Sequence, residues 1–101
     1  MREFVQSAMD ELRRYHLPKD VRDMYGWDTS HVLSTSVNEL TGTITVAKLQ
    51  DQPAPQKMHC HIDDYGRIVI PKEITEYLEW TTQTPISAKP AQEGQAIILS
   101  L

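Results

Sequence analysis

Hydrophobic and polar side chains alternate through "KMHCHID", residues 57–63. An alternation with a period of two predicts a strand that buries one face. The following "DYG" supplies turn residues, with Gly66 free to adopt a positive φ, and the apolar run at residues 67–70 predicts a returning strand. We therefore expect residues 58–70 to form a β-hairpin.

The pattern changes at Pro71, where the hairpin ends. Proline lacks an amide hydrogen and has a fixed φ, so it suits the first turn of a helix. Ile74, Tyr77 and Leu78 follow at the i, i+3 and i+4 spacing. This spacing predicts an amphipathic helix over residues 71–80 with these three side chains on its buried stripe.

Two more strands are predicted after the helix, at residues 85–89 and 96–101, with a turn at residues 93–94. The order of elements from residue 58 to residue 101 is therefore β-β-α-β-β. The predicted fold class is mainly β with short helices.

The sequence contains an internal repeat. When residues 9–48 are laid on residues 62–101, an offset of 53 positions, eight of the forty positions are identical without a gap. The identical pairs are Asp10/Asp63, Arg14/Arg67, Pro18/Pro71, Lys19/Lys72, Trp27/Trp80, Thr29/Thr82, Ser34/Ser87 and Ile44/Ile97. The alternative is a coincidence between two short amphipathic units.

The repeat predicts how the chain is organised. We expect a first, degenerate repeat at residues 9–48, a Pro- and Gln-containing linker at residues 49–57 and a second repeat at residues 58–101. Units of about 40 residues seldom bury enough apolar surface to fold alone. The two repeats are therefore expected to pack together as one pseudo-dimeric domain, residues 1–101, in a pseudo-two-fold arrangement.

The first repeat is less regular at its start. Residues 31–37 and 43–49 predict strands joined around residues 38–42. Residues 4–9 form either an opening strand or part of an N-terminal helix, and the pattern allows both. Arg13 occupies the place of the turn glycine of the second repeat, so the tight turn is less assured there.

The composition limits the cellular compartments and the binding partners that we expect. The net charge is −4, which gives no overall attraction to nucleic acid or anionic lipid, although a local basic patch remains compatible with it. A single cysteine excludes an internal disulfide and favours a reducing compartment. The apolar runs are shorter than a membrane helix requires, and the N-terminus lacks a signal-peptide core. We therefore expect a soluble, cytoplasmic protein with no membrane partner.

The second repeat resembles the AbrB/SpoVT/MazE family of swapped-hairpin proteins, whose SpoVT-AbrB domain binds DNA. The most specific segment is "DDYGRIVIPKEI", residues 63–74, which a helix and a terminal strand follow. The resemblance implies a small barrel in which two β-β-α-β-β units interleave their hairpins. It also implies a transcriptional regulator that binds double-stranded DNA, as a homo-oligomer, here a dimer of pseudo-dimers.

By position, the resemblance implies DNA contacts from basic residues at the hairpin turns and helix starts. These residues are Arg13, Arg14, Lys19, Arg22, Arg67 and Lys72. Regulators of this family often carry a pair of arginines on the helix. Here Thr75 and Glu76 stand at those places in the second repeat, and fewer phosphate contacts lower affinity for DNA.

Each candidate also has a structural interpretation. Arg14 and Arg67 are equally compatible with pairing to Asp10 or Asp63 across the hairpin. Lys19 and Lys72 fit solvated first-turn positions. The two tryptophans that follow the helices fit caps on the core better than platforms for base stacking.

Other chemistry has little support in the sequence. "HCHIDD", residues 59–64, places two histidines on one strand face, but a zinc site needs three or four ligands, so no metal and no cofactor is expected. Motifs of nucleophilic or phosphate-transfer catalysis are not found, so we do not expect an enzyme. The alternative to DNA binding is a module of the same fold that binds a protein partner, as an antitoxin does, and has lost DNA binding.

Overall fold

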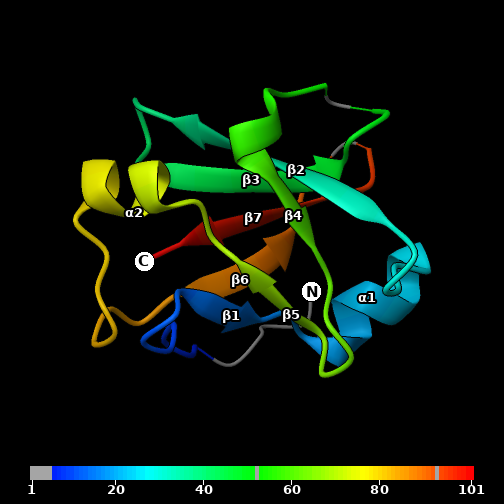
Figure 1. The fold of residues 1–101 in the computed structure, drawn as a ribbon, viewed down its shortest axis with the longest axis horizontal. Coiled ribbons are helices and arrows are strands. Elements are labelled where there is room, and N and C mark those ends of the chain that lie inside the picture. Colours follow the sequence, from blue (N-terminus) through cyan, green and yellow to red (C-terminus); the bar gives the residue numbers. More distant parts are fainter. Residues whose placement is uncertain (1–5, 52, 93) are drawn as a thin grey trace.

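The computed structural model describes residues 6–51, 53–92 and 94–101, which form two antiparallel sheets and two short α-helices (Figure 1). The strands are β1 (Arg14–His16), β2 (Val32–Asn38), β3 (Thr43–Lys48), β4 (His59–His61), β5 (Arg67–Val69), β6 (Ser87–Pro90) and β7 (Ala96–Ser100). The helices are α1 (Lys19–Tyr25), α2 (Lys72–Leu78) and the 3₁₀ helix η1 (Gln56–Met58). The predicted mainly-β class is confirmed.

Strand pairing divides the molecule into a small and a large sheet. β1 and β5 form a two-stranded sheet, and the others follow the order β4-β2-β3-β7-β6. In Figure 1 the β1–β5 pair lies on one side of the molecule, away from β2 and β3. Side chains from both sheets and both helices, among them Ile68, Leu33, Val21 and Ile74, belong to one buried cluster. The two sheets therefore share a single hydrophobic core.

The predicted hairpin over residues 58–70 is wrong as a paired ladder. The turn forms, because Asp63 N donates to Arg67 O at 2.9 Å and Gly66 N donates to Asp63 O at 3.0 Å. The strands then separate, so that β4 pairs with β2 and β5 pairs with β1. The pairing with β5 gives the backbone groups of the short strand β1 their partners.

The first repeat forms the same tight turn although Arg13 replaces glycine. Asp10 N donates to Arg14 O and Arg13 N donates to Asp10 O, both at 3.0 Å. Arg13 has a φ of 61°, close to the 80° of Gly66. A non-glycine residue in this region is strained, so the hydrogen bonds of the turn hold it there.

The N-terminal helix alternative is wrong for residues 6–13, which are not helical. Ser7 instead forms a single antiparallel bridge to Ile86, with hydrogen bonds of 3.0 and 2.8 Å in the two directions. The remainder of the predicted opening strand, residues 4 and 5, lies outside the described residues. The bridge extends the sheet beyond its edge strand β6.

Both α-helices start directly after a proline, as the sequence predicts. Pro18 and Pro71 have extended ψ values of 135° and 136° and serve as the N-caps of α1 and α2. The predicted buried stripe of the second helix is partly wrong, because Tyr77 is 58% exposed while Thr75 is buried. A helix of only seven residues has room for little more than one buried turn, and here that turn is formed by Ile74 and Thr75.

The other predicted strands are found within a few residues of their expected bounds. The exception is the start of the strand predicted at residues 57–63, where η1 precedes β4. Of the turn predicted at residues 93–94, Glu93 lies outside the described residues and Gly94 has a φ of 73°. No helix in the described part of the chain is long and apolar enough to cross a bilayer.

Equivalent elements recur at a constant distance along the chain. β1, α1 and β3 begin at Arg14, Lys19 and Thr43, and β5, α2 and β7 begin 53 positions later, at Arg67, Lys72 and Ala96. The pairing of Leu33 with Cys60 also has its counterpart, because Ile86 pairs with Ser7 at the same offset.

Candidate nucleic-acid interface

β1 and β5, with the turn residues beside them, form what we call the β1–β5 ribbon, residues 13–16 and 66–70. Arg14 lies opposite Val69, Tyr15 opposite Ile68 and His16 opposite Arg67. Side chains alternate across a strand, so the central pair points one way and the outer pairs point the other. Tyr15 and Ile68 are fully buried. The ribbon therefore turns Arg14, His16, Arg67 and Val69 toward the outside.

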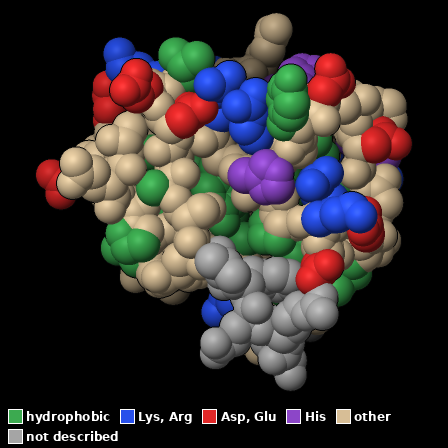
Figure 2. All heavy atoms as spheres, turned by 90° about the horizontal axis from the view of Figure 1, so that it is seen from below, with side chains coloured by type: hydrophobic (Ala, Val, Ile, Leu, Met, Phe, Trp, Pro, Cys, Tyr) green, Lys and Arg blue, Asp and Glu red, His purple; other side chains and the backbone are tan. Residues whose placement is uncertain are grey.

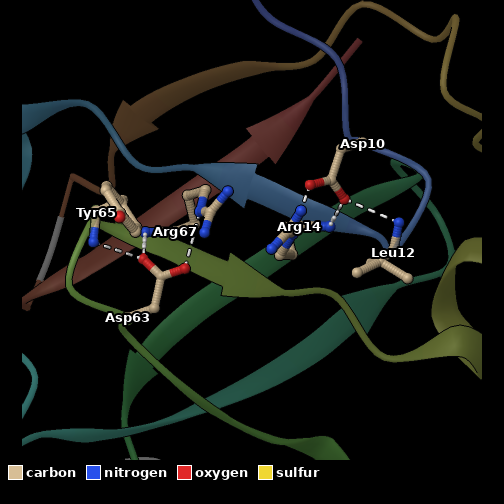
Figure 3. Close-up of polar contacts among 6 residues, drawn as sticks. All are labelled: Asp10, Leu12, Arg14, Asp63, Tyr65 and Arg67. Carbon is tan, nitrogen blue, oxygen red and sulfur yellow. Dashed lines mark hydrogen bonds and ion pairs between the residues drawn. The ribbon is translucent and has the colours of Figure 1, made fainter.

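Arg14 and Arg67 are each held by an aspartate from their own turn (Figure 3). Arg67 Nε donates to Asp63 Oδ2 at 2.8 Å, and Arg14 Nε donates to Asp10 Oδ2 in the same way. The other carboxylate oxygen of each aspartate accepts two backbone N–H groups, which for Asp63 are those of Tyr65 and Arg67. Pairing with Asp10 and Asp63, the structural one of the two interpretations that the sequence allows, is therefore found, although each pair lies within one turn and not across a hairpin.

The hydrogen bonds of the turns change the acidity of the two aspartates. Desolvation raises the pKa of Asp63, but the backbone and side-chain hydrogen bonds from Arg67, together with its charge, outweigh it and lower the pKa below its usual value. Asp10 has a lowered pKa from the same balance, with Arg14 as its partner. Both carboxylates therefore stay ionised at neutral pH and hold their arginines in place.

The pairing leaves the two guanidinium groups accessible. The side chains of Arg14 and Arg67 are 34% and 27% exposed, and within the described structure their bonds to aspartate run through Nε. A guanidinium has five N–H donors, so the terminal nitrogens keep the capacity to bind an anion. Arg67 also lies 4.9 Å from the ring centroid of Tyr65, a cation–π contact that further fixes its position.

The other two arginines of the predicted set, Arg13 and Arg22, lie at the ends of the ribbon. Arg13 Nε donates to Ile70 O at 3.3 Å, and Arg22 Nε donates to Leu17 O at 3.2 Å. Arg22 comes from α1, and its guanidinium covers Gly66 so closely that a Cβ there would lie 2.5 Å from Cζ. Neither arginine forms an ion pair with any residue that the structure describes.

The two lysines do not belong to the ribbon. Lys19 and Lys72 lie in the first turns of α1 and α2 and reach Asp23 and Glu76 at 3.9 and 3.7 Å. Their side chains are 77% and 69% exposed, and exposed pairs of this kind contribute little to stability. The structure therefore brings the four arginines of the predicted set together and leaves the two lysines on the helices as solvated positions.

Figure 2 shows Lys, Arg and His side chains gathered across the face that carries the ribbon, with carboxylates among and around them. The sequence prediction missed His16, which is exposed and lies opposite Arg67. The signal that could have found it is the shared alternation of "RYH" and "RIV", in which the middle residue is buried and the flanking residues face outward.

Other candidate groups do not assemble into a site. In the described ranges no cluster of three His, Cys, Asp or Glu side chains could hold a metal ion. His59 Nε2 is within hydrogen-bonding distance of Ala54 O at 2.8 Å, and burial raises the pKa of the Cys60 thiol to about 12. Trp27 and Trp80 are buried at 4% and 6% exposure, which agrees with their interpretation as core caps and removes them as stacking platforms.

Comparison with known proteins identifies no relative of this chain. No family model matches the chain, and neither a curated protein nor a solved structure shows significant similarity to it.

Proposed function

We propose that the protein binds duplex DNA through the β1–β5 ribbon and acts as a transcriptional regulator of the AbrB-like type. The observation that carries the proposal is the row of four arginines, Arg13, Arg14, Arg67 and Arg22, along one short ribbon. Arginine binds phosphate with paired, charge-assisted hydrogen bonds, and such contacts supply much of the affinity of proteins for DNA.

The proposal includes the swapped-hairpin fold. The pairing of β4 with β2 and of β5 with β1 supports it, because both strands that flank the second-repeat turn add to strands of the first repeat. The register supports a pseudo-two-fold axis, because the central pairs Tyr15–Ile68 and Thr45–Ile98 each join positions 53 apart. Two interleaved units around one core would form the pseudo-dimeric domain that the repeat predicts.

The size of the ribbon suits a groove of DNA. Gly66 to Ile70 spans four residue steps, about 13 Å for a strand. The major groove of B-DNA is about 12 Å wide and admits a two-stranded β-ribbon. The guanidinium groups of such a ribbon would reach the phosphates at the groove walls, while His16 would face the base edges.

The acidic residues limit the affinity that we expect. The net charge of −4 repels DNA at long range, and Asp10 and Asp63 neutralise part of the charge of the ribbon. Each phosphate contact releases condensed counterions and adds about 0.9 to the slope of log affinity against log salt. We therefore expect binding that is weak at physiological salt and clear at low salt.

The test is a fluorescence-anisotropy titration of a labelled 20-base-pair duplex across a salt series. We expect the Arg14→Ala/Arg67→Ala variant to bind more weakly and to lower the salt slope by about two, one for each lost phosphate contact. Lys48→Ala is the control, because it removes one positive charge from β3, outside the ribbon. A folded wild-type protein that does not bind duplex at low salt would contradict the proposal.

The second candidate function is binding of a protein partner by the same face. Leu12, Tyr65 and Val69 are 61%, 72% and 44% exposed within or beside the ribbon, and apolar side chains of this kind favour protein contacts. Recovery of a stoichiometric protein partner, together with a blank DNA titration, would favour this candidate.

We also propose that two copies of the chain associate on DNA, which would double the number of arginines and set a half-site spacing. Light scattering of the protein with and without duplex measures the mass and tests this point. A complex that contains a single chain at every duplex length would exclude the further dimer.

A further inference from the structure

The two ends of the β1–β5 ribbon differ in sequence but present the same chemical group. At an offset of 53 positions, Arg13 corresponds to Gly66 and Arg22 corresponds to Thr75. One end therefore takes its arginine from the turn, and the other end takes its arginine from the helix α1.

The hydrogen bonds of these two arginines are equivalent. Arg13 Nε donates to Ile70 O, and Arg22 Nε donates to Leu17 O. Leu17 and Ile70 are themselves 53 positions apart, and each is the residue that follows its ribbon strand. Leu17 N donates to Gly66 O at 3.0 Å, and Ile70 N donates to Arg13 O at 2.9 Å. Both guanidinium groups are thus hydrogen-bonded to equivalent backbone carbonyls, one in each repeat.

Steric restrictions explain why one end of the ribbon has its arginine in the turn and the other end has it in the helix. Gly66 leaves room for the Arg22 guanidinium, which a Cβ at position 66 would meet at 2.5 Å. At the other end, where the turn residue is Arg13, the helix position equivalent to Arg22 holds Thr75, a short side chain whose Oγ1 donates to Lys72 O at 2.8 Å. Each end of the ribbon therefore has one guanidinium group, and the other of its two positions holds a small residue.

We infer that Arg13 and Arg22 are the same anion-binding group supplied from two different positions, and that the ribbon therefore contacts the two strands of a DNA duplex with matched arginine pairs. The pairs are Arg14 with Arg67 and Arg13 with Arg22, placed about the central pair Tyr15–Ile68. Because the two strands of a duplex are related by local dyads, a two-fold arrangement of cations meets one phosphate backbone with each half. The inference rests on the proposed function for its DNA ligand.

The equivalence of the two sites has a test that needs no DNA. Gly66→Arg alone places a new side chain against Arg22 and should lower the midpoint of thermal unfolding. Adding Arg22→Thr reproduces the arrangement of the other end and should recover most of the loss. A double variant that is as unstable as the sum of the two single variants would overturn the equivalence.

The equal contribution of the two arginines to DNA binding is tested with Arg13→Ala and Arg22→Ala in the same anisotropy titration. Each should weaken binding by the same factor and reduce the salt slope by about one. Phosphate-ethylation interference should give contacts on both strands that are symmetric about one point. If either variant fails to fold by circular dichroism, Arg13→Gln and Arg22→Gln replace the pair, because glutamine keeps an N–H donor and loses the charge.

The outcomes separate the two claims. Unequal losses, or contacts on a single strand, would overturn the inference and leave DNA binding by the ribbon intact. Absence of binding by the wild-type protein would overturn the proposed function and its DNA ligand together, whereas the stability cycle would still decide whether the two arginine sites are equivalent.

Discussion

Asp10 and Asp63 fix Arg14 and Arg67 through Nε and leave the terminal guanidinium nitrogens available. Each carboxylate accepts two backbone N–H groups of its turn and one Nε, so that the turn and the arginine are fixed by a single side chain. The structural and the DNA-contact interpretations of these arginines are therefore compatible, because an Nε bond to aspartate leaves the terminal nitrogens for a phosphate.

Asp63→Asn should lower the stability of the protein at neutral pH and weaken its response to acid. The folded-state pKa of Asp63 is lowered below the unfolded value of about 3.9, so its contribution is complete above that value and is lost as pH falls through the folded pKa. The difference in unfolding midpoint between wild type and variant should therefore be constant above about pH 5 and shrink below about pH 4.

Asp64→Asn is the matched control, because Asp64 is exposed in the same turn and shows no ion pair with any residue in the described ranges. Its unfolding midpoint should stay close to that of the wild type at every pH. A constant difference between wild type and Asp63→Asn down to pH 2 would contradict the account of the turn.

At this scale the sequence indicated the arginine–aspartate pairs as one of two interpretations, because both partners lie close together in the chain, four positions apart. It did not predict the place of Arg22, whose guanidinium reaches Gly66 from another element 44 positions away. It also missed His16, because the outward direction of that side chain depends on which residues of the three-residue strand β1 face the core. Contacts across distant elements follow from tertiary packing, which the local pattern does not contain.

At the scale of single elements, the two α-helices end in the same left-handed conformation with different residues. Gly26 caps α1 with a φ of 66°, and Glu79 caps α2 with a φ of 59°. The residue after each cap turns back, with Trp27 N donating to Arg22 O and Trp80 N donating to Thr75 O, both at 2.9 Å. The backbone thus requires the left-handed region at both caps, although only one cap has the residue that prefers it.

Glu79→Gly should raise the free energy of unfolding by about 0.5–1 kcal/mol, because glycine removes the strain of a side chain at positive φ. Gly26→Ala should lower it by about 1 kcal/mol for the same reason. Urea unfolding followed by circular dichroism measures both changes. Effects of similar size and opposite sign would agree with the same left-handed cap geometry at both helices. Destabilisation by both variants would contradict this geometry.

Among the elements, the sequence located the helices because a proline marks each start, and it located the strands because their alternation is clear. The paired hairpin at residues 58–70 was wrong for a physical reason. The local pattern shows that two strands meet at a turn, but β4 and β5 pair with β2 and β1, which are far away in the sequence and which the local pattern does not identify. Tyr77 was misplaced because helical spacing does not show how much of a short helix the core covers.

At the scale of the whole molecule, most of the sheet pairings join one half of the chain to the other. β1 pairs with β5, β2 with β4 and β3 with β7, whereas β2–β3 and β6–β7 are the only pairings of named strands within one half in the described residues. Each half alone would therefore expose unpaired strand edges and the inner face of the shared core.

Residues 1–52 and 53–101, produced as separate chains, should each fail to form a folded monomer. Mixing them should restore a folded one-to-one complex, because the pairings across the halves do not require the covalent linker. Circular dichroism and analytical ultracentrifugation measure the folding and the mass. A well-folded monomer of either half would contradict the interleaved arrangement.

The most direct test of DNA binding by the β1–β5 ribbon is a ¹⁵N-labelled nuclear magnetic resonance titration with a short duplex at low salt. We expect the amide shifts to concentrate at residues 13–16 and 66–70, together with changes in the side-chain Nε signals of Arg13, Arg14, Arg22 and Arg67, while β2 and β3 change little. Shifts centred on the five-stranded sheet, or no shifts from a folded protein, would contradict it.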